Sequence, residues 1–492
     1  MKKITKLLTI SSTAAVLMVG ASFSSLAAQS GWVQTDDTWN YLDSSGNKAT
    51  DTWKKSGNSW FYLDSNGDMA TDQWVEETYY VDAQGIRLAN QWVYADAGTD
   101  GAPNSEGGWF YFDNSGKVVT DGWKTLGGKK FHFASDGTMD YGWLTDNDST
   151  YYLGDSDQGF AQTGWICLDF DAENLPSDGD VSNVSDSASS SSKWFYFQSN
   201  GKAVKASTDA YISKTINGKK YYFDGNGVML TGWVSMASSS NDSAEDPTGI
   251  STFKYFGGDD DGQMSKGWRY LTDQPEDSDD SANIKTATSS NAESDTGDGS
   301  WYYFDNNGVP KYLNGTADSM SKATSRINGQ NYFFDAYGRM QYGLISLELP
   351  DGTLQTAYFG NSDSDGKMKT DKTANVEEDN GDRSTFYFET SGTNKGAGYS
   401  GDKKNYLYYN GKLVKADKGS TTQVFEVNGK LYLVNESGQI QKNNKCYKSD
   451  GDYRYEISGG VLYNIDADKQ RQGEVTSGEA LPEISVRASY TL

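Results

Sequence analysis

The sequence predicts an all-β fold, a repetitive β-hairpin solenoid with polar insertions at some hairpin tips. Three observations lead to this prediction. A tryptophan preceded by glycine or a short polar residue returns every 18 to 22 residues wherever the spacing is undisturbed. Between these tryptophans stands a cluster of aromatic residues, followed by a polar residue and a glycine turn. Glycines arrive every few residues and no stretch keeps an apolar period of about 3.6, which disfavours helices.

The recurring tryptophans mark the first strand of each expected hairpin. They are Trp32, Trp53, Trp74, Trp92, Trp123, Trp143, Trp165, Trp233 and Trp268. In the clearest unit, residues 122–126 form the first strand and residues 129–133 the returning strand. Gly127 and Gly128 between them allow the positive φ angles that a tight hairpin turn needs.

The aromatic clusters mark the returning strands, and the glycine after each cluster marks an outer turn to the next unit. Clear copies occupy residues 60–67, 109–116 and 301–308, and weaker copies occupy residues 221–224, 332–335, 386–388 and 432–434. A two-stranded hairpin alone is marginally stable in water. Each hairpin must therefore bury its aromatic face against its neighbours, which predicts a stacked, solenoidal array.

Composition divides the chain into five expected parts. They are a secretory signal at 1–28, well-formed repeats at 29–168, a polar insertion at 169–193, degenerate repeats at 194–465 with acidic insertions at 237–251, 273–299 and 371–384, and a non-repeat tail at 466–492. The insertions are rich in Ser, Asp, Glu and Asn, so they should not fold alone. We interpret 169–193, 237–251 and 273–299 as elongated, projecting hairpin tips. For 169–193 and 273–299, a linker between domains is an equal alternative.

The first residues are typical of a signal for export. Lys2, Lys3 and Lys6 precede a small and apolar run, and small residues surround the expected cleavage position at Ala27 or one residue later. No later segment is apolar enough for a membrane span. The tail lacks the apolar stretch and basic end of a covalent wall-sorting signal. We therefore expect a secreted protein that is held non-covalently at a bacterial cell wall or cell surface.

The charge balance excludes some partners. The chain has 68 acidic and 43 basic residues, a formal net charge of −25, which repels nucleic acid and anionic lipid. A polymer that carries cationic groups would be attracted, although acidic surfaces also serve solubility alone. Cys167 and Cys446 stand in different parts of the chain, and we expect them to be unpaired.

No catalytic constellation is predicted. His132 is the only histidine, so no Ser-His-Asp or Cys-His system is available, and this residue is expected to pack inside a strand. Paired carboxylates suffice for glycoside hydrolysis, but the non-repeat stretches are too short to hold a catalytic domain. Residues 361–366 imitate the start of a calcium loop, yet Lys372 stands where that loop needs a bidentate Glu. We expect no enzyme, no cofactor and no metal site.

The units at 122–143 and 46–74 resemble the cell-wall-binding repeat, also known as the choline-binding repeat. Repeats of clostridial toxins and of streptococcal glucan-binding proteins look similar. The resemblance extends over roughly residues 31 to 465 and is strongest up to Trp165. It implies a hairpin solenoid, and it leaves the ligand open.

Where the family binds choline, two aromatic residues of one hairpin and one of the next surround the quaternary ammonium, which the electron-rich ring faces attract. The resemblance implies a Trp that opens the aromatic cluster and a second Trp fourteen residues later. Three units comply: Trp39 with Trp53 and Tyr62, Trp60 with Trp74 and Tyr80, and Trp109 with Trp123 and His132. Elsewhere the opening position holds Thr78, Lys130, Thr150, Lys220 or Asn331. The alternative is that these rings only pack hairpin on hairpin.

Together these patterns predict a non-catalytic surface protein that binds a cell-wall polymer or glycan. The expected polymer is choline-bearing teichoic acid, or a glucan or galactose-type glycan. The competing hypothesis is an adhesin, or a protein that binds host glycans without recognising choline. The oligomeric state is left open.

Overall fold

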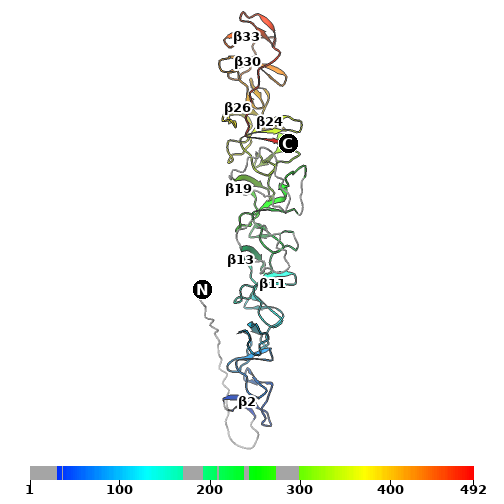
Figure 1. The fold of residues 1–492 in the computed structure, drawn as a ribbon, viewed down its shortest axis with the longest axis vertical. Helices are drawn as coiled ribbons and strands as arrows, with labels where there is room; N and C mark the ends of the chain where they lie inside the picture. Colours follow the sequence, from blue (N-terminus) through cyan, green and yellow to red (C-terminus); the bar gives the residue numbers. More distant parts are fainter. Residues whose placement is uncertain (1–29, 36, 170–191, 208–209, 238–242, 273–298) are drawn as a thin grey trace. The chain divides into compact units, whose positions relative to one another are not determined.

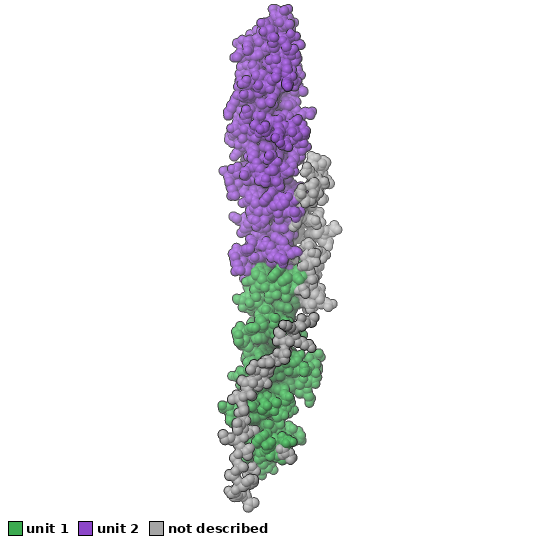
Figure 2. All heavy atoms as spheres, turned by 90° about the vertical axis from the view of Figure 1, so that its left-hand side faces the viewer, with its two compact units in different colours: residues 1–205 green, residues 206–492 purple. Residues whose placement is uncertain are grey.

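The computed structural model describes residues 30–35, 37–169, 192–207, 210–237, 243–272 and 299–492. The expected signal at 1–28, nearly all of the insertion at 169–193 and nearly all of that at 273–299 lie outside the described residues. The chain divides into two units, residues 1–205 and 206–492, coloured green and purple in Figure 2. We describe each unit by itself.

Unit 1 consists of two-stranded antiparallel hairpins that follow one another along the chain (Figure 1). Its strands pair as β1 (Gly31–Thr35) with β2 (Thr38–Leu42), β3 (Thr52–Ser56) with β4 (Ser59–Leu63), β5 (Gln73–Val75) with β6 (Tyr79–Val81), β7 (Gln91–Ala95) with β8 (Gly108–Phe112), β9 (Gly122–Leu126) with β10 (Lys129–Phe133), β11 (Trp143–Asp146) with β12 (Ser149–Tyr152), and β13 (Gly164–Asp169) with β14 (Ser192–Phe197).

Unit 2 begins in the same way and then changes to wider sheets. Its hairpins are β15 (Ile212–Ile216) with β16 (Lys219–Phe223), β17 (Trp233–Ser235) with β18 (Phe253–Tyr255), β19 (Gly267–Leu271) with β20 (Ser300–Phe304), β21 (Thr324–Ile327) with β22 (Gln330–Phe333), and β30 (Thr422–Val427) with β31 (Lys430–Asn435). Two short helical turns, η3 (Ile250–Thr252) and α1 (Met320–Ala323), precede β18 and β21.

Among the described residues of unit 2, three sheets have more than two strands. They are β23 (Leu344–Glu348) between β24 (Leu354–Tyr358) and β36 (Ala488–Thr491); β25 (Asp371–Glu377), β26 (Arg383–Phe388), β29 (Lys412–Leu413), β28 (Tyr406–Tyr409) and β27 (Gly401–Lys403) in that order; and β32 (Cys446–Ser449), β33 (Asp452–Ser458), β34 (Val461–Ile465) and β35 (Arg471–Glu474). Cys446 thus lies in unit 2, whereas Cys167 lies on β13 of unit 1.

Local sequence explains the hairpins. Gly127 and Gly128 between β9 and β10 have φ angles of 57° and 81°, the left-handed pair that matches the twist of two antiparallel strands. The bounds of β9 and β10 confirm the predicted strands at 122–126 and 129–133. Between β15 and β16, Asn217 and Gly218 take the same conformation, with φ angles of 50° and 79°.

In many of the outer turns, a single Asp side chain shapes the turn. Asp305 Oδ1 accepts hydrogen bonds from the backbone N–H groups of Asn307 at 2.8 Å and Val309 at 2.9 Å. The N–H of Gly308 donates to the Asp305 carbonyl at 3.0 Å. The carboxylates of Asp43, Asp64, Asp82, Asp113, Asp224 and Asp335 accept the same two N–H groups of their own turns. The Asp of the sequence pattern is therefore a turn-forming residue.

We expect Asp305→Ala to lower the free energy of unfolding of unit 2 by about 1 kcal/mol, because two backbone donors lose a local acceptor. Asp305→Asn keeps an acceptor oxygen and should cost less. Urea denaturation of both variants checks the prediction. Equal losses in the two variants would show that the charge of Asp305, and not its hydrogen bonds, supports the turn.

Backbone hydrogen bonds join most of the hairpins within each unit to the one before, although Pro310, at this position after β20, has no N–H to donate. The N–H just after an outer turn donates to a carbonyl on the second strand of the preceding hairpin. Examples are Arg87 N to Trp60 O at 2.9 Å and Met139 N to Trp109 O at 2.8 Å. The same bond recurs from Met69 to Trp39, Val118 to Thr78, Ala161 to Lys130, Ala203 to Thr150, Met264 to Lys220, Met340 to Trp301 and Met368 to Asn331. These bonds form a regular ladder within each unit.

The core is built from rings of adjacent hairpins. Trp74 packs against two buried rings of the next hairpin, Phe110 at 5.0 Å and Phe112 at 5.3 Å between centroids. Trp92, Trp143, Trp233 and Trp268 each repeat this contact with two rings of the hairpin that follows them. No hairpin hides these rings alone, so stacking is obligatory. The predicted all-β hairpin solenoid is confirmed.

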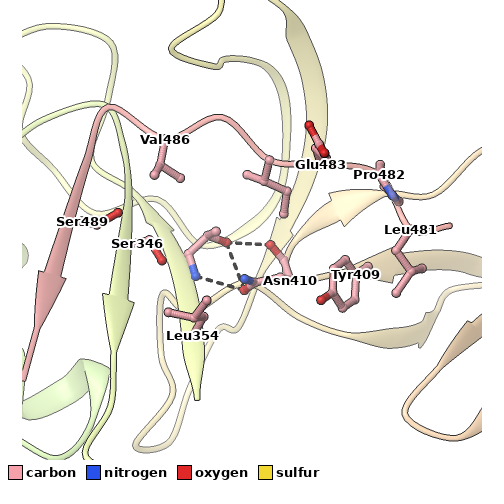
Figure 3. A pocket seen from close by; sticks show the side chains of 11 residues that line it. Ser346, Leu354, Tyr409, Asn410, Leu481, Pro482, Glu483, Val486 and Ser489 are labelled. Carbon is pink, nitrogen blue, oxygen red and sulfur yellow. Dashed lines mark hydrogen bonds between the residues drawn. The ribbon is translucent and has the colours of Figure 1, made fainter. Parts of the chain in front are cut away.

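The tail, expected as a non-repeat region, runs back along earlier strands of unit 2. Strand β36 pairs in parallel with β23, with Leu347 opposite Tyr490. The Tyr490 ring lies 4.9 Å from that of Phe333. Upstream of β36, Ile484 and Val486 pack on the cluster that contains Leu344, Tyr358, Val376, Phe386 and Phe388. Figure 3 shows Val486 and Ser489 beside Ser346 of β23.

Two expected insertions differ from their prediction. Residues 371–384 form β25, the turn that follows it and the start of β26, and Val376 is fully buried. A register shift between Thr373 and Val376 interrupts the alternation of buried and exposed residues that would have indicated a strand. The described part of 237–251, residue 237 and residues 243–251, does not project. Thr248 is buried there and donates a hydrogen bond to the Ala336 carbonyl at 2.6 Å.

Candidate aromatic-box sites

Hairpin register places two tryptophans on one face of a hairpin. In β3–β4, Trp53 pairs with Tyr62 and Lys55 pairs with Trp60. Trp53 and Trp60 are therefore diagonal neighbours across the two strands, within reach of each other's large side chains. The opening residue of an aromatic cluster thus belongs with the first-strand Trp of its own hairpin.

The next hairpin supplies a third ring. Tyr79, on β6, lies 5.1 Å from Trp53. The guanidinium of Arg87, which follows the next outer turn, lies 5.4 Å from the Trp53 ring, 5.4 Å from the Trp60 ring and 5.5 Å from the Tyr79 ring. Trp60 is 36% exposed. We call these three rings the Trp53 box.

A second box has the same construction in unit 1. Trp92 and Trp109 lie 6.4 Å apart and nearly perpendicular, and Phe131 of the next hairpin lies 5.0 Å from Trp92. Tyr94, which pairs with Trp109 across the strands, adds a ring at 5.3 Å from Trp109 and is half exposed. We call Trp92, Trp109 and Phe131 the Trp92 box.

Unit 2 contains a third box. Trp268 and Trp301 lie 6.3 Å apart and nearly perpendicular, and Tyr332 of the next hairpin lies 4.8 Å from Trp268. Tyr270, opposite Trp301, contacts it at 5.4 Å. Burial raises the pKa of the Tyr332 hydroxyl, so this wall stays neutral at ordinary pH. We call Trp268, Trp301 and Tyr332 the Trp268 box.

The first expected group, Trp39 with Trp53 and Tyr62, is divided between two hairpins. Trp53 and Tyr62 meet at 5.2 Å as cross-strand partners. Trp39 is half-buried on β2, and its carbonyl accepts the N–H of Met69. Trp32, on the facing strand of the same hairpin, contacts Phe61 of the next hairpin at 5.3 Å. Trp39 therefore belongs with Trp32, by the same register that joins Trp60 to Trp53.

The second expected group is split between two places. Trp74 is 6% exposed and contacts Tyr80 at 5.7 Å within the core. The hydroxyl of Tyr80 donates to Asp72 at 2.7 Å, and burial with this carboxylate strongly raises the pKa of Tyr80. Trp60 stands in the Trp53 box, and among the described residues it has no ring contact with Trp74.

The third expected group brings two of its members together. Trp123 and His132 are cross-strand partners with ring centroids 4.9 Å apart. The Trp123 Nε1–H donates to Asp146 at 2.7 Å, and Asp140 lies 2.5 Å from His132 Nδ1. Trp109 is a wall of the Trp92 box. His132 thus lies inside a repeat strand beside a carboxylate, as a packing residue would.

The three complete units of the expected site set do not include Trp92, Trp268 or Trp301, which are walls of the candidate boxes. A separation of fourteen residues joins the second strand of one hairpin to the first strand of the next, and that next Trp faces the hairpin after it. The useful signal is the cross-strand register. Once the tip between the strands is ignored, whatever its length, Trp301 aligns with Trp268 as Trp60 aligns with Trp53.

The boxes offer cation binding and apolar stacking. Their walls are ring faces, which attract a cation without requiring a hydrogen-bond donor from it. In the part of the chain that the structure describes, no cluster of three or more His, Cys, Asp or Glu side chains is arranged to hold a metal ion. Within that same part, no helix is long and apolar enough to cross a membrane.

Two family models match the repeats. The model described as the choline-binding repeat matches residues 49–86, which include the Trp53 box. The model described as a putative cell wall binding repeat matches residues 30–48, 104–118, 121–139, 142–157, 189–203, 214–229 and 296–309. These stretches contain Trp39, Trp109 and Trp301 among the opening residues of aromatic clusters.

Similar proteins extend the comparison. Over 315 residues the chain is 24% identical to glucosyltransferase-S of Streptococcus mutans, a match that covers 64% of this chain and 16% of that protein. The structure of choline-binding protein F from Streptococcus pneumoniae has 20% identity, with 72% of this chain and 98% of that chain covered and a TM-score of 0.37. The modular autolysin LytC from the same species has 19% identity, covers 65% and 55%, and has a TM-score of 0.35.

Proposed function

The chain carries repeats that match the choline-binding and cell-wall-binding repeat models, and from this premise we propose that it is a non-catalytic, secreted protein that attaches non-covalently to a bacterial cell wall. Its aromatic boxes take up the quaternary ammonium groups of a choline-bearing wall polymer.

The recurrence of one box geometry supports this proposal. The Trp92 and Trp268 boxes lie in different units, yet each sets two perpendicular tryptophans about 6.4 and 6.3 Å apart with a third ring from the next hairpin. A cation placed between these faces gains roughly 0.5 to 2 kcal/mol per good contact, more as water is excluded.

Several weak sites suffice for retention. A single box of this kind binds on the order of millimolar, about −4 kcal/mol. When several boxes on one chain meet a repeating polymer, each further contact becomes intramolecular, and avidity rises by a factor of about 10² to 10⁴. The net charge of −25 adds long-range attraction for a polymer with cationic groups.

The test uses purified choline-bearing walls and the full chain. We expect choline at tens of millimolar, a concentration above the roughly millimolar affinity of one box, to elute the protein. Trp109→Ala combined with Trp301→Ala should weaken retention by about tenfold or more, since each substitution removes a wall of a different box. Tyr141→Ala, at a ring that is 59% exposed and outside the boxes, is the matched control and should behave as the parent chain.

Three other results would contradict or change the proposed function. Elution by soluble glucan but not by choline would contradict choline recognition and favour a glucan-binding surface. Release of soluble wall fragments during incubation would contradict the non-catalytic role. Adhesion to host cells that survives the double substitution would favour the adhesin alternative.

A further inference from the structure

Arg87 is held at a position that faces the Trp53 box. Its N–H donates to the Trp60 carbonyl at 2.9 Å, as part of the ladder between hairpins, and it forms a β-bridge with Val81. This fixes the backbone from which the side chain starts. The guanidinium lies 5.4, 5.4 and 5.5 Å from the centroids of Trp53, Trp60 and Tyr79, so it is equally placed among all three rings.

The three rings are the partners of this guanidinium. Among the described residues, the Arg87 side chain has no ion pair and no hydrogen bond, although the chain has an excess of carboxylates. Three other arginines do pair with carboxylates: Arg339 with Asp335 at 2.7 Å, Arg383 with Glu377 at 2.8 Å and Arg471 with Glu456 at 2.6 Å. Arginine is suited to ring faces because its planar, weakly hydrated cation stacks on them.

The following outer turn encloses the Arg87 side chain. A Cβ atom on Gly116 would lie 2.5 Å from Arg87 Nε and 3.0 Å from Arg87 Cδ. Gly116 has a φ angle of 78°, which other residues rarely adopt. The absence of a side chain at this turn therefore leaves the space that the arginine occupies.

A second side-chain cation, that of Lys130, lies against the rings of a related site. Lys130 replaces the opening Trp of its hairpin, and its Nζ lies 4.0 Å from the Trp123 ring and 5.3 Å from the Tyr151 ring. Trp123 and Tyr151 correspond to Trp53 and Tyr79, with centroids 4.6 Å apart. Lys130 thus takes the place of the Trp wall of this box and also places a charge over the two remaining rings, Trp123 and Tyr151.

We propose that Arg87 is a built-in ligand of the Trp53 box, so that this box is closed to free choline and instead locks adjacent hairpins together. The inference rests on the proposed function of the boxes as ammonium sites. The Trp92 and Trp268 boxes have Met139 and Met340 at the position of Arg87, with the same ladder bond to Trp109 and Trp301, both at 2.8 Å. Arg87 therefore decides which boxes accept an external cation.

The experiment replaces Arg87 of the Trp53 box by Met, the residue that the Trp92 and Trp268 boxes have at this position. Choline chloride is titrated into the full chain and into Arg87→Met while tryptophan fluorescence is recorded. The signal of Trp60 is isolated by subtracting the same titration with Trp60→Phe in each background. We expect no choline response of Trp60 in the parent chain and a saturable response, on the order of millimolar, in Arg87→Met. Arg383→Met, which removes an ion-paired arginine, should create no new response.

Thermal unfolding gives an independent measurement. Loss of the internal cation should lower the Tm of Arg87→Met, and choline should raise that Tm by more than it raises the parent's, because ligand that binds only the folded state stabilises it. A Trp60 response in the parent as large as in Arg87→Met would overturn the proposal, and so would the absence of any gain in Arg87→Met. If that variant does not fold by circular dichroism, Arg87→Gln is judged by the same two outcomes.

The Trp268 box separates this proposal from the one on which it rests. The choline response of Trp301, isolated with Trp301→Phe, reports on the proposed function alone. A parent chain whose Trp301 does not respond counts against choline binding. A parent chain whose Trp301 responds, together with an Arg87→Met chain without a gain at Trp60, counts against the internal ligand only.

Discussion

Ending the chain after Glu483 is expected to lower the free energy of unfolding of unit 2 by about 5 kcal/mol, at roughly 1 kcal/mol for each partly buried apolar side chain that is lost. The removed side chains are Ile484, Val486, Ala488, Tyr490 and Leu492, all packed on buried clusters. The truncation also removes β36, so β23 changes from a central strand to an edge strand.

Urea denaturation followed by circular dichroism measures this loss. Thr491→Ala is the control, because the Thr491 side chain is exposed and makes only a 3.4 Å contact with Glu348. Trp53, Trp92 and the other tryptophans of unit 1 should keep their fluorescence in the truncated chain. A truncation that leaves the urea midpoint unchanged would show that the tail does not contribute to the stability of unit 2.

Phe304→Ala is expected to cost about 3 to 5 kcal/mol, the range for removing a buried ring from a packed core. Phe304 is 1% exposed, and its ring lies 5.4 Å from Trp233, 6.4 Å from Tyr255 and 6.3 Å from Tyr302. It therefore joins the hairpins β17–β18 and β19–β20, and its removal leaves a cavity at their interface.

The loss should remain local along the chain. In a stacked array each unit contacts only its neighbours, so the substitution weakens one interface directly. Amide hydrogen exchange should increase first in β17 to β20, while β30 and β31 keep their protection. Phe304→Leu, which fills most of the space, should cost less than Phe304→Ala. Uniform loss of protection across unit 2 would contradict nearest-neighbour stability.

The hairpins were predictable from sequence because their signals are local. A glycine pair such as Gly127 and Gly128, placed between two short β-rich runs, specifies turn and strands together. The pairing of β36 with β23 was not predictable, because its partners are distant in sequence and no turn links them. Strand β25 was missed for another reason. Asn375, with a φ angle of 55°, bulges the strand and breaks its alternation.

The candidate boxes share some residues with the expected site set but group them differently. Trp53, Trp60 and Trp109 stand in boxes with two tryptophans, as the aromatic pattern indicated. Their partners were misjudged because distance along the chain is a poor guide when hairpin tips vary in length. The charge that occupies the Trp53 box was also hidden, since Arg87 comes from the turn of another hairpin and no motif in its own segment indicates a role.

The ladder between hairpins has a consequence for engineering. Its bonds leave from residues just after the outer turns and end on second strands, so the tips take no part in it. Ser56 and Ser59 border a short tip, whereas Leu271 and Ser300 border a long one, and both hairpins keep the same register. The repeat pitch is therefore independent of tip length, and a reporter peptide grafted at a tip should leave the spacing of neighbouring docking points unchanged.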